Sequence, residues 1–244
     1  MKQLRWVTGS VIGAAVALIA PAAATATPFS YPFNDSNQTF TVLQNGGSTP
    51  ATLVSTGGNP GGFIRLTDAI AETGCPTAAP CDVSLFEGPN PLPGSLTANY
   101  GGTWSFDFKT DVAPSVNKNV YLVINDAAGE GLVKSIPPAN TTNWQHFSGS
   151  LTEPGWLLYD FGVGTSAPAT EAQFKSVLST AIAPDIQPDI YTGSGEHYGL
   201  DNFVFTDGPQ PASAPPAATA PARKKCKKGR KLKHGRCVKK KVRK

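Results

Sequence analysis

Positive charge is scarce over most of this 244-residue chain. Residues 27–222 contain five basic side chains and all 17 acidic ones, a net charge of −12, whereas residues 223–244 contain 14 basic and no acidic side chains. The overall net charge of +4 therefore describes neither part. An acidic body of this kind is repelled at long range by polyanionic surfaces, so we expect the cationic C-terminal tail to attract such partners.

Long apolar runs are also missing beyond the N-terminus, and no later stretch could span a membrane as a helix. Residues 1–26 have the features of a signal peptide: basic Lys2 and Arg5, an apolar stretch at 6–20, and a small-residue cleavage site at 24–26. The alternative, an N-terminal membrane anchor, is less favoured because the apolar run has only about 15 residues. We therefore expect a secreted protein, located outside the cell or on its envelope.

Cysteine is rare, with four residues, and no two of them have the CxxC spacing of a zinc site. Three disulfide connectivities are open for four cysteines. Because export leads to an oxidising compartment, we expect the local pairing, Cys75–Cys81 in the body and Cys226–Cys237 in the tail.

The motifs of familiar enzyme classes are absent: there is no P-loop, dinucleotide fingerprint, HExxH or GxSxG. Ser194 lies near His197 in a glycine-rich turn, and His146 lies on an expected strand, but neither has the context of a nucleophile. The sequence cannot show which of the 17 carboxylates come together, so it identifies no glycosidase pair. A non-enzyme is favoured, with a polysaccharide-acting enzyme as the alternative.

Short extended segments separated by turn residues fill the region 28–207. Trp104, Phe106 and Phe108 alternate with polar residues, which places the three rings on one buried face of a strand. The spacing of such segments predicts an antiparallel β-sandwich or barrel. The expected strands are 38–43, 51–56, 62–67, 103–109, 119–125, 130–136, 144–150 and 200–206.

One segment has helical periodicity, and it predicts a single helix over 171–182 that packs on the sandwich. Thr170 and Gln173 have the spacing of a capping box, and Pro184 is expected to stop the helix. The chain therefore divides into a signal peptide, a folded body over 27–207, a disordered Pro/Ala-rich linker over 208–222 and a basic tail over 223–244.

An ordered set of motifs in the body points to a known family. The set comprises GGNPGGFIRLTD (57–68), YGGTWSFDF (100–108), NVYLVIND (119–126), NWQHFSGSLTEPGW (143–156), TEAQFKSVLST (170–180) and GLDNFVF (199–205). In this order the body resembles the laminin IV type A domain, also called laminin B. The resemblance implies an all-β, galactose-binding-like jelly roll. The sequence differs from the laminin family in two ways. It has a Pro-rich segment that contains Cys75 and Cys81, and it lacks the cysteine-rich repeats that flank laminin domains.

The resemblance implies a non-catalytic extracellular protein that binds glycans or mediates adhesion. Aromatic rings stack on sugar faces and polar groups bind hydroxyls, so the candidate ligand residues are Trp156, Tyr191, His197 and Tyr198. Core packing of each ring remains equally open. The resemblance also implies a structural calcium ion held by Asp68 and Asp201, for which the alternative is a solvated or turn-capping role. No other cofactor is expected.

The basic tail is expected to stay solvated, because 14 positive charges on 22 residues cannot collapse. Its expected partners are cell-wall polyanions, acidic polysaccharides or anionic lipid surfaces. Nucleic acid is also negatively charged but is a less favoured partner. A solubilising tail without a fixed partner is the alternative. For the whole protein, a structural matrix component that binds only protein is the third hypothesis.

Overall fold

The computed structural model describes residues 29–44, 46–69, 84–114, 118–139, 141–188, 190 and 194–209, with the backbone of 230–233 and 236–239. The chain divides into two compact units, Met1–Gly208 and Pro209–Lys244, and each is described by itself. The expected signal peptide, both disulfides, Tyr191 and most of the linker and tail lie outside the described residues.

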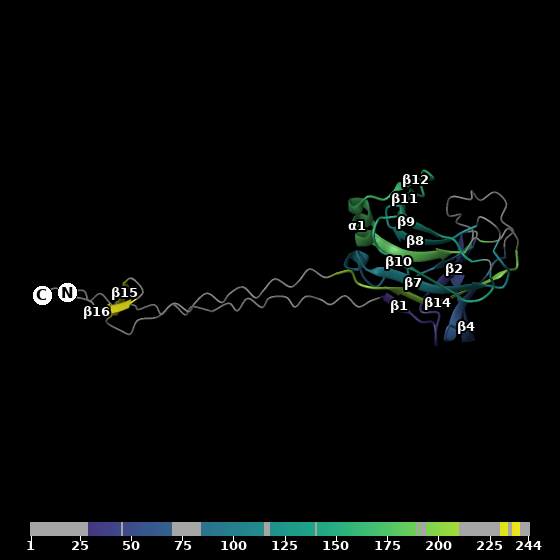
Figure 1. The fold of residues 1–244 in the computed structure, drawn as a ribbon, viewed down its shortest axis with the longest axis horizontal. Helices are drawn as coiled ribbons and strands as arrows, with labels where there is room; N and C mark the ends of the chain where they lie inside the picture. The colour runs from purple at the N-terminus through teal and green to yellow at the C-terminus, as the bar shows by residue number, and fades with distance from the viewer. Residues whose placement is uncertain are drawn as a thin grey trace, which may run out of the picture. The chain divides into compact units, whose positions relative to one another are not determined.

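The body is a sandwich of two antiparallel sheets (Figure 1). Sheet A has the order β10-β7-β14-β5-β4, with β1 also paired to β14, and sheet B has the order β12-β11-β9-β8-β13-β6-β2-β3. The strands of sheet A are β1 (Phe29–Tyr31), β4 (Thr52–Gly58), β5 (Gly61–Thr67), β7 (Thr103–Thr110), β10 (Gln145–Ser150) and β14 (His197–Phe205). The strands of sheet B are β2 (Thr41–Gln44), β3 (Gly47–Pro50), β6 (Ser84–Glu87), β8 (Val120–Asp126), β9 (Glu130–Ile136), β11 (Leu157–Asp160), β12 (Thr165–Pro168) and β13 (Ala181–Gln187).

The all-β jelly-roll prediction is confirmed, and the expected strands are present with shifts of a few residues at their ends. The shorter strands β1, β3, β6, β11 and β12 were not predicted. Neither was β13, which begins directly after the helix and contains Pro184. The helix ends at Thr180, two residues before its predicted end, and Pro184 lies within the strand that follows. This strand lies between β8 and β6, with a register shift between Ala181 and Ala183.

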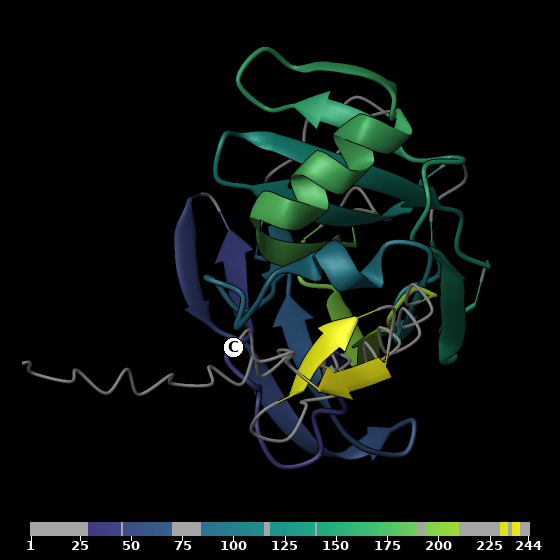
Figure 2. The ribbon, with the colours of Figure 1, turned by 90° about the vertical axis from the view of Figure 1, so that its left-hand side faces the viewer.

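The core lies between the sheets, where Trp104, Phe106 and Phe108 are buried on the inner face of β7 as expected. Helix α1 (Glu171–Thr180) packs beside the short 3₁₀ helix η1 (Leu96–Asn99) and against β8 and β9 (Figure 2). Its buried face consists of Phe174, Val177 and Leu178, and the predicted capping box is present. Helix periodicity and capping thus position the one α-helix of the described body correctly.

In the second unit, β15 (Arg230–Lys233) and β16 (Arg236–Lys239) form an antiparallel hairpin. Leu232 lies opposite Cys237 in this hairpin. Within the described part of the chain, no helix is both long enough and apolar enough to cross a membrane.

Candidate functional site

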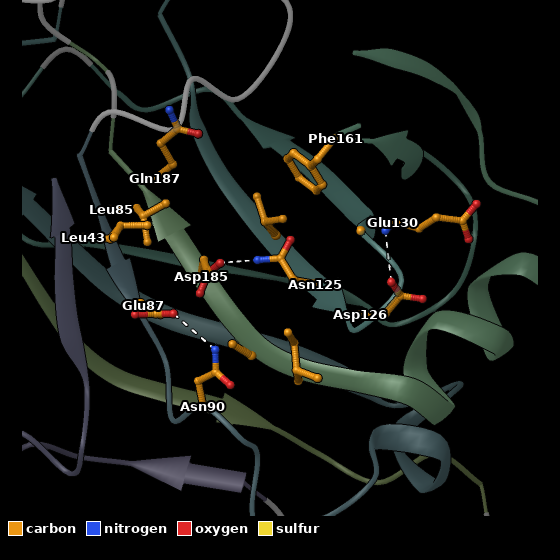
Figure 3. A pocket seen from close by; sticks show the side chains of 14 residues that line it. Leu43, Leu85, Glu87, Asn90, Asn125, Asp126, Glu130, Phe161, Asp185 and Gln187 are labelled. Carbon is orange, nitrogen blue, oxygen red and sulfur yellow. Dashed lines mark hydrogen bonds between the residues drawn. The ribbon is translucent and has the colours of Figure 1, made fainter. Parts of the chain in front are cut away.

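A hollow of about 250 Å³ lies on the outer face of sheet B, on the opposite side from the core (Figure 3). This hollow, the sheet B groove, is formed by outward positions of β2, β6, β8 and β13 and by the turns that follow β8 and β11. Its polar side chains are Glu87, Asn90, Asn125, Asp126, Glu130, Asp185 and Gln187. Apolar side chains, among them Leu43, Leu85, Val123 and Phe161, lie between them.

Gln187 contributes a buried donor to the groove. Its side chain is 1% exposed, and its Nε2 has no hydrogen-bond partner within the described part of the chain. Leaving a buried donor unsatisfied costs about 1–3 kcal/mol, so such groups are rare in folded proteins. A ligand that carries an acceptor at this position would remove that cost.

The acidic side chains near the end of β13 already accept hydrogen bonds from the protein. Asn125 donates from Nδ2 to Asp185 across β8 and β13. Glu87 accepts from the Thr41 hydroxyl at 2.8 Å and from Asn90 at 3.3 Å. These contacts hold the polar side chains in fixed positions across the floor of the groove (Figure 3).

Asp126 closes the turn between β8 and β9. Its Oδ1 accepts from the backbone N–H groups of Ala128 and Glu130, at 2.8 and 3.0 Å, and its Oδ2 accepts from the Thr180 hydroxyl. This pattern is that of a turn-capping aspartate. Asp126 therefore shapes one end of the groove, and both of its carboxylate oxygens already accept hydrogen bonds from the protein.

Phe161 supplies an aromatic ring at the rim of the groove (Figure 3). It is 37% exposed, and its ring centroid lies 4.7 Å from that of Tyr159, with the planes tilted by 55°. Phe161 and Val163, both in the turn after β11, are the large hydrophobic side chains exposed within the described residues. The sequence signal that could have found them is the apolar pair inside the glycine-rich turn FGVG.

Two of the predicted ligand residues belong to the core instead. Trp156 is 1% exposed, packs edge-on to Phe174 at 5.4 Å between centroids, and donates from Nε1 to the carbonyl of Ser150 at 3.2 Å. Tyr198 is equally buried and stacks on Phe108. Of the two roles left open for these rings, both have core packing, because Tyr198 has an inward position on β14 and Trp156 packs against the helix.

His197 lies on the outer face of sheet A, where its Nδ1 is 2.9 Å from the hydroxyl of Thr67. It lines a second pocket, on the opposite side of the sandwich from the sheet B groove. Tyr198 also lines this pocket, although its side chain is buried, whereas Trp156 does not, so the structure brings together two of the three described members of the predicted set.

Asp68 and Asp201 are also separated. Asp68 accepts from the hydroxyl of Ser84 on β6, at 2.9 Å, and so connects the two sheets. Asp201 lies on the outer face of sheet A, where its Oδ2 accepts from the N–H of Asn59 at 2.6 Å and its Oδ1 from the N–H of Asn202 at 2.8 Å. Burial raises the pKa of Asp201 above its ordinary value.

The separation means that Asp68 and Asp201 do not form a common cation site. Among the described residues, no group of three or more His, Cys, Asp or Glu side chains could hold a metal ion. Calcium also needs six or more oxygen ligands, which two distant carboxylates do not supply. A calcium ion therefore remains a prediction of the resemblance alone.

Two antiparallel sheets with one packed helix define the class of this body as a jelly-roll β-sandwich. No protein-family model matches the sequence, and no curated protein does. In structure the chain is similar to the L4b domain of human laminin alpha-2, with a TM-score of 0.51 and 12% identity over 75% of this chain and 98% of that domain. CtCBM11 has a TM-score of 0.48 and 13% identity, over 78% of this chain and 100% of that one. The laminin similarity confirms, at the level of the fold, the resemblance seen in the motifs.

Proposed function

We propose that this protein is a secreted, non-catalytic module that binds an extracellular glycan in the sheet B groove. The observation that supports this most directly is the buried Nε2 of Gln187, which has no partner among the described residues and lies in a groove with an exposed aromatic rim. A sugar offers hydroxyl acceptors for such a donor and an apolar face for the ring of Phe161.

The size of the groove limits how a glycan binds. Its volume of about 250 Å³ lies below the range for pockets that enclose a small ligand, which is roughly 300–1,000 Å³. The groove therefore accommodates one face of a short stretch of a polysaccharide and leaves the rest in solvent. This mode suits attachment to a long polymer, in which neighbouring sugars extend beyond the protein.

The enzyme alternative requires two carboxylates that are free to act as acid and base on one bond. In the groove, Glu87, Asp126 and Asp185 accept hydrogen bonds from protein donors that position loops and neighbouring strands. These contacts give each of the three carboxylates a structural role, which supports binding without turnover. Incubation with a polysaccharide panel should release no reducing ends, and turnover abolished by one Asp or Glu substitution would contradict the proposal.

A glycan array with the body (27–207) identifies the ligand, and calorimetry then compares two variants of one turn. Phe161→Ala should weaken binding of the best glycan about tenfold, because an aromatic contact contributes about 0.5–1.5 kcal/mol beyond its buried area. Val163→Ala is the matched control, since Val163 is 72% exposed and does not line the groove. Equal binding by the two variants, or binding of proteins only, would contradict the glycan site.

The proposed function also includes the basic tail, which would attach the secreted protein to anionic cell-surface polymers. The support is the charge distribution: 14 basic and no acidic side chains follow a body of net charge −12. An acidic body cannot attract such polymers at long range, whereas the tail can.

A further inference from the structure

A second pocket, of about 360 Å³, lies on the outer face of sheet A and is named the sheet A pocket. It contains two of the five basic residues of the acidic body, Arg65 on β5 and Lys109 on β7. In the strand register both pair with Gly199 of β14, which lies between them. Two cations are thus placed on either side of one glycine, in a part of the chain where cations are rare.

The side chain of Arg65 has no hydrogen bond or ion pair among the described residues, although the body carries 17 acidic side chains. Its Nε is buried and unsatisfied. Guanidinium groups in this situation normally have a carboxylate partner, because burial without one costs free energy. The free guanidinium is therefore available to a ligand.

Lys109 is held in place by aromatic and backbone contacts. Its ammonium lies 4.0 Å from the ring centroid of Phe63 and 4.6 Å from that of Trp144, and it donates to the carbonyl of Gly57 at 3.1 Å. These contacts leave the charge without a directly bonded carboxylate within the described residues. Lys109 thus adds a fixed positive field to one wall of the pocket.

Gly199 allows the side chains of Lys109 and Phe63 to pack closely against β14. A β-carbon at this position would lie 3.0 Å from Cγ of Lys109 and 3.1 Å from Cδ2 of Phe63. Both are tighter than ordinary van der Waals contacts, so any larger residue would displace Lys109 or Phe63. The glycine therefore helps to set the position of Lys109 in the wall of the pocket.

The chemistry around the pocket restricts its ligand. Strand β14 is paired with β5 on one side and β7 on the other, so no strand edge is open to an extended peptide, and only side chains can contact the ligand. The exposed carboxylate of Asp111 is part of the lining and disfavours multiply charged groups. The side chains of Thr110 and Thr142 and the ring of Phe63 complete the wall.

We propose that the sheet A pocket binds the carboxylate of an acidic sugar, with Arg65 as its bidentate partner and Lys109 as a supporting charge. A planar carboxylate carries one negative charge and matches the guanidinium fork. The pocket volume accommodates a single uronic acid residue with room for water. This site is independent of the sheet B groove and lies on the other sheet.

The test follows the backbone amide signals of the secreted full-length protein by NMR during titration with methyl galacturonide. The amide of Gly199 and the indole of Trp144 should shift and saturate, whereas methyl galactoside, the neutral counterpart, should shift neither. Arg65→Gln should weaken binding tenfold or more, because it removes two charge-assisted hydrogen bonds. Lys175→Gln removes the same charge from helix α1 and should change the affinity less than twofold.

Arg65→Lys provides a second variant that retains the charge but loses the fork, and it should bind with an intermediate affinity. Equal shifts with the neutral sugar, no saturable shift, or an unchanged affinity in Arg65→Gln would each overturn the proposal. So would stronger binding of an acidic dipeptide at the same residues. Phe161→Ala should leave uronate binding intact, which separates failure of this site from failure of the sheet B groove.

Discussion

The ring of Phe161 lies over Gly131, with Cε2 2.7 Å from the point where a β-carbon of residue 131 would lie. Gly131 pairs with Asn125 on one side and Tyr159 on the other, so it forms the part of the sheet surface on which the ring rests. The aromatic rim of the sheet B groove thus depends on the absence of a side chain on β9.

Gly131→Ala should displace the Phe161 ring and weaken glycan binding at least threefold, because the contact is too close for a methyl group. Calorimetry with the glycan selected on the array measures this loss. Gly47→Ala on β3 is the control, since a β-carbon there would contact only the Gln44 carbonyl, at 3.5 Å. Unchanged affinity in Gly131→Ala would show that the position of the ring does not matter.

Trp156→Ala should lower the free energy of unfolding by about 3–5 kcal/mol, because it leaves a cavity in the core. Urea denaturation measures the change. The folded fraction should bind glycan with unchanged affinity, since Trp156 is buried and does not line the groove. Lost binding without lost stability would restore Trp156 as a ligand residue.

The pH dependence of stability should reveal the buried Asp201. Burial is the main cause of its raised pKa, and the charge of Asp107 acts in the same direction, against the N–H donors of Asn59 and Asn202. A raised folded-state pKa means that folding favours the protonated acid. The resulting stability is complete below the ordinary pKa of 3.8 and is lost as the pH rises through the folded-state value.

The Tm of the wild type relative to that of Asp201→Asn should therefore be highest in acid and should fall toward pH 7, as the buried carboxyl ionises in the wild type only. Thermal unfolding at a series of pH values measures it. The amide is the suitable comparison because it does not titrate and has nearly the same shape. A wild-type Tm that rises relative to that of Asp201→Asn with increasing pH would mean that the ionised form is the one stabilised by folding.

Deletion of residues 223–244 should abolish association with cell walls while leaving the Tm of the body unchanged. If six of the 14 cations displace counterions, the affinity of the full chain should fall by about three orders of magnitude between roughly 50 and 200 mM salt. Pull-down with isolated cell walls measures both effects. Equal retention of the truncated protein at low salt would assign attachment to the body.

Mass spectrometry of the secreted protein should show Cys75–Cys81 and Cys226–Cys237 linkages, since local pairing closes the shortest loops in an oxidising compartment. Reduction before digestion is the control that releases the linked peptides. Free thiols, or a bridge between body and tail, would contradict the division of the chain into body, linker and tail.

Strands with clear alternation were predictable, because inward and outward positions repeat along them. The TWSFDF segment of β7 and the helix with its capping box are examples. Strand β13 was missed, because its Pro184 is typical of a helix stop and its pairing partners are far away in the sequence. Local patterns do not encode such long-range pairings.

The amino-acid sequence alone determined the class of fold, the position of the helix and the separation of charge between body and tail, since each depends on local periodicity or composition. Only the tertiary structure decided which side chains share a surface. Burial removed Trp156 and Tyr198 from the candidate site, and strand register separated Asp68 from Asp201. The same register placed Arg65 and Lys109 on either side of Gly199, although the two cations are 44 residues apart along the chain. The reason is that hydrogen bonding between strands, and not distance in the sequence, decides which residues are neighbours in a sheet.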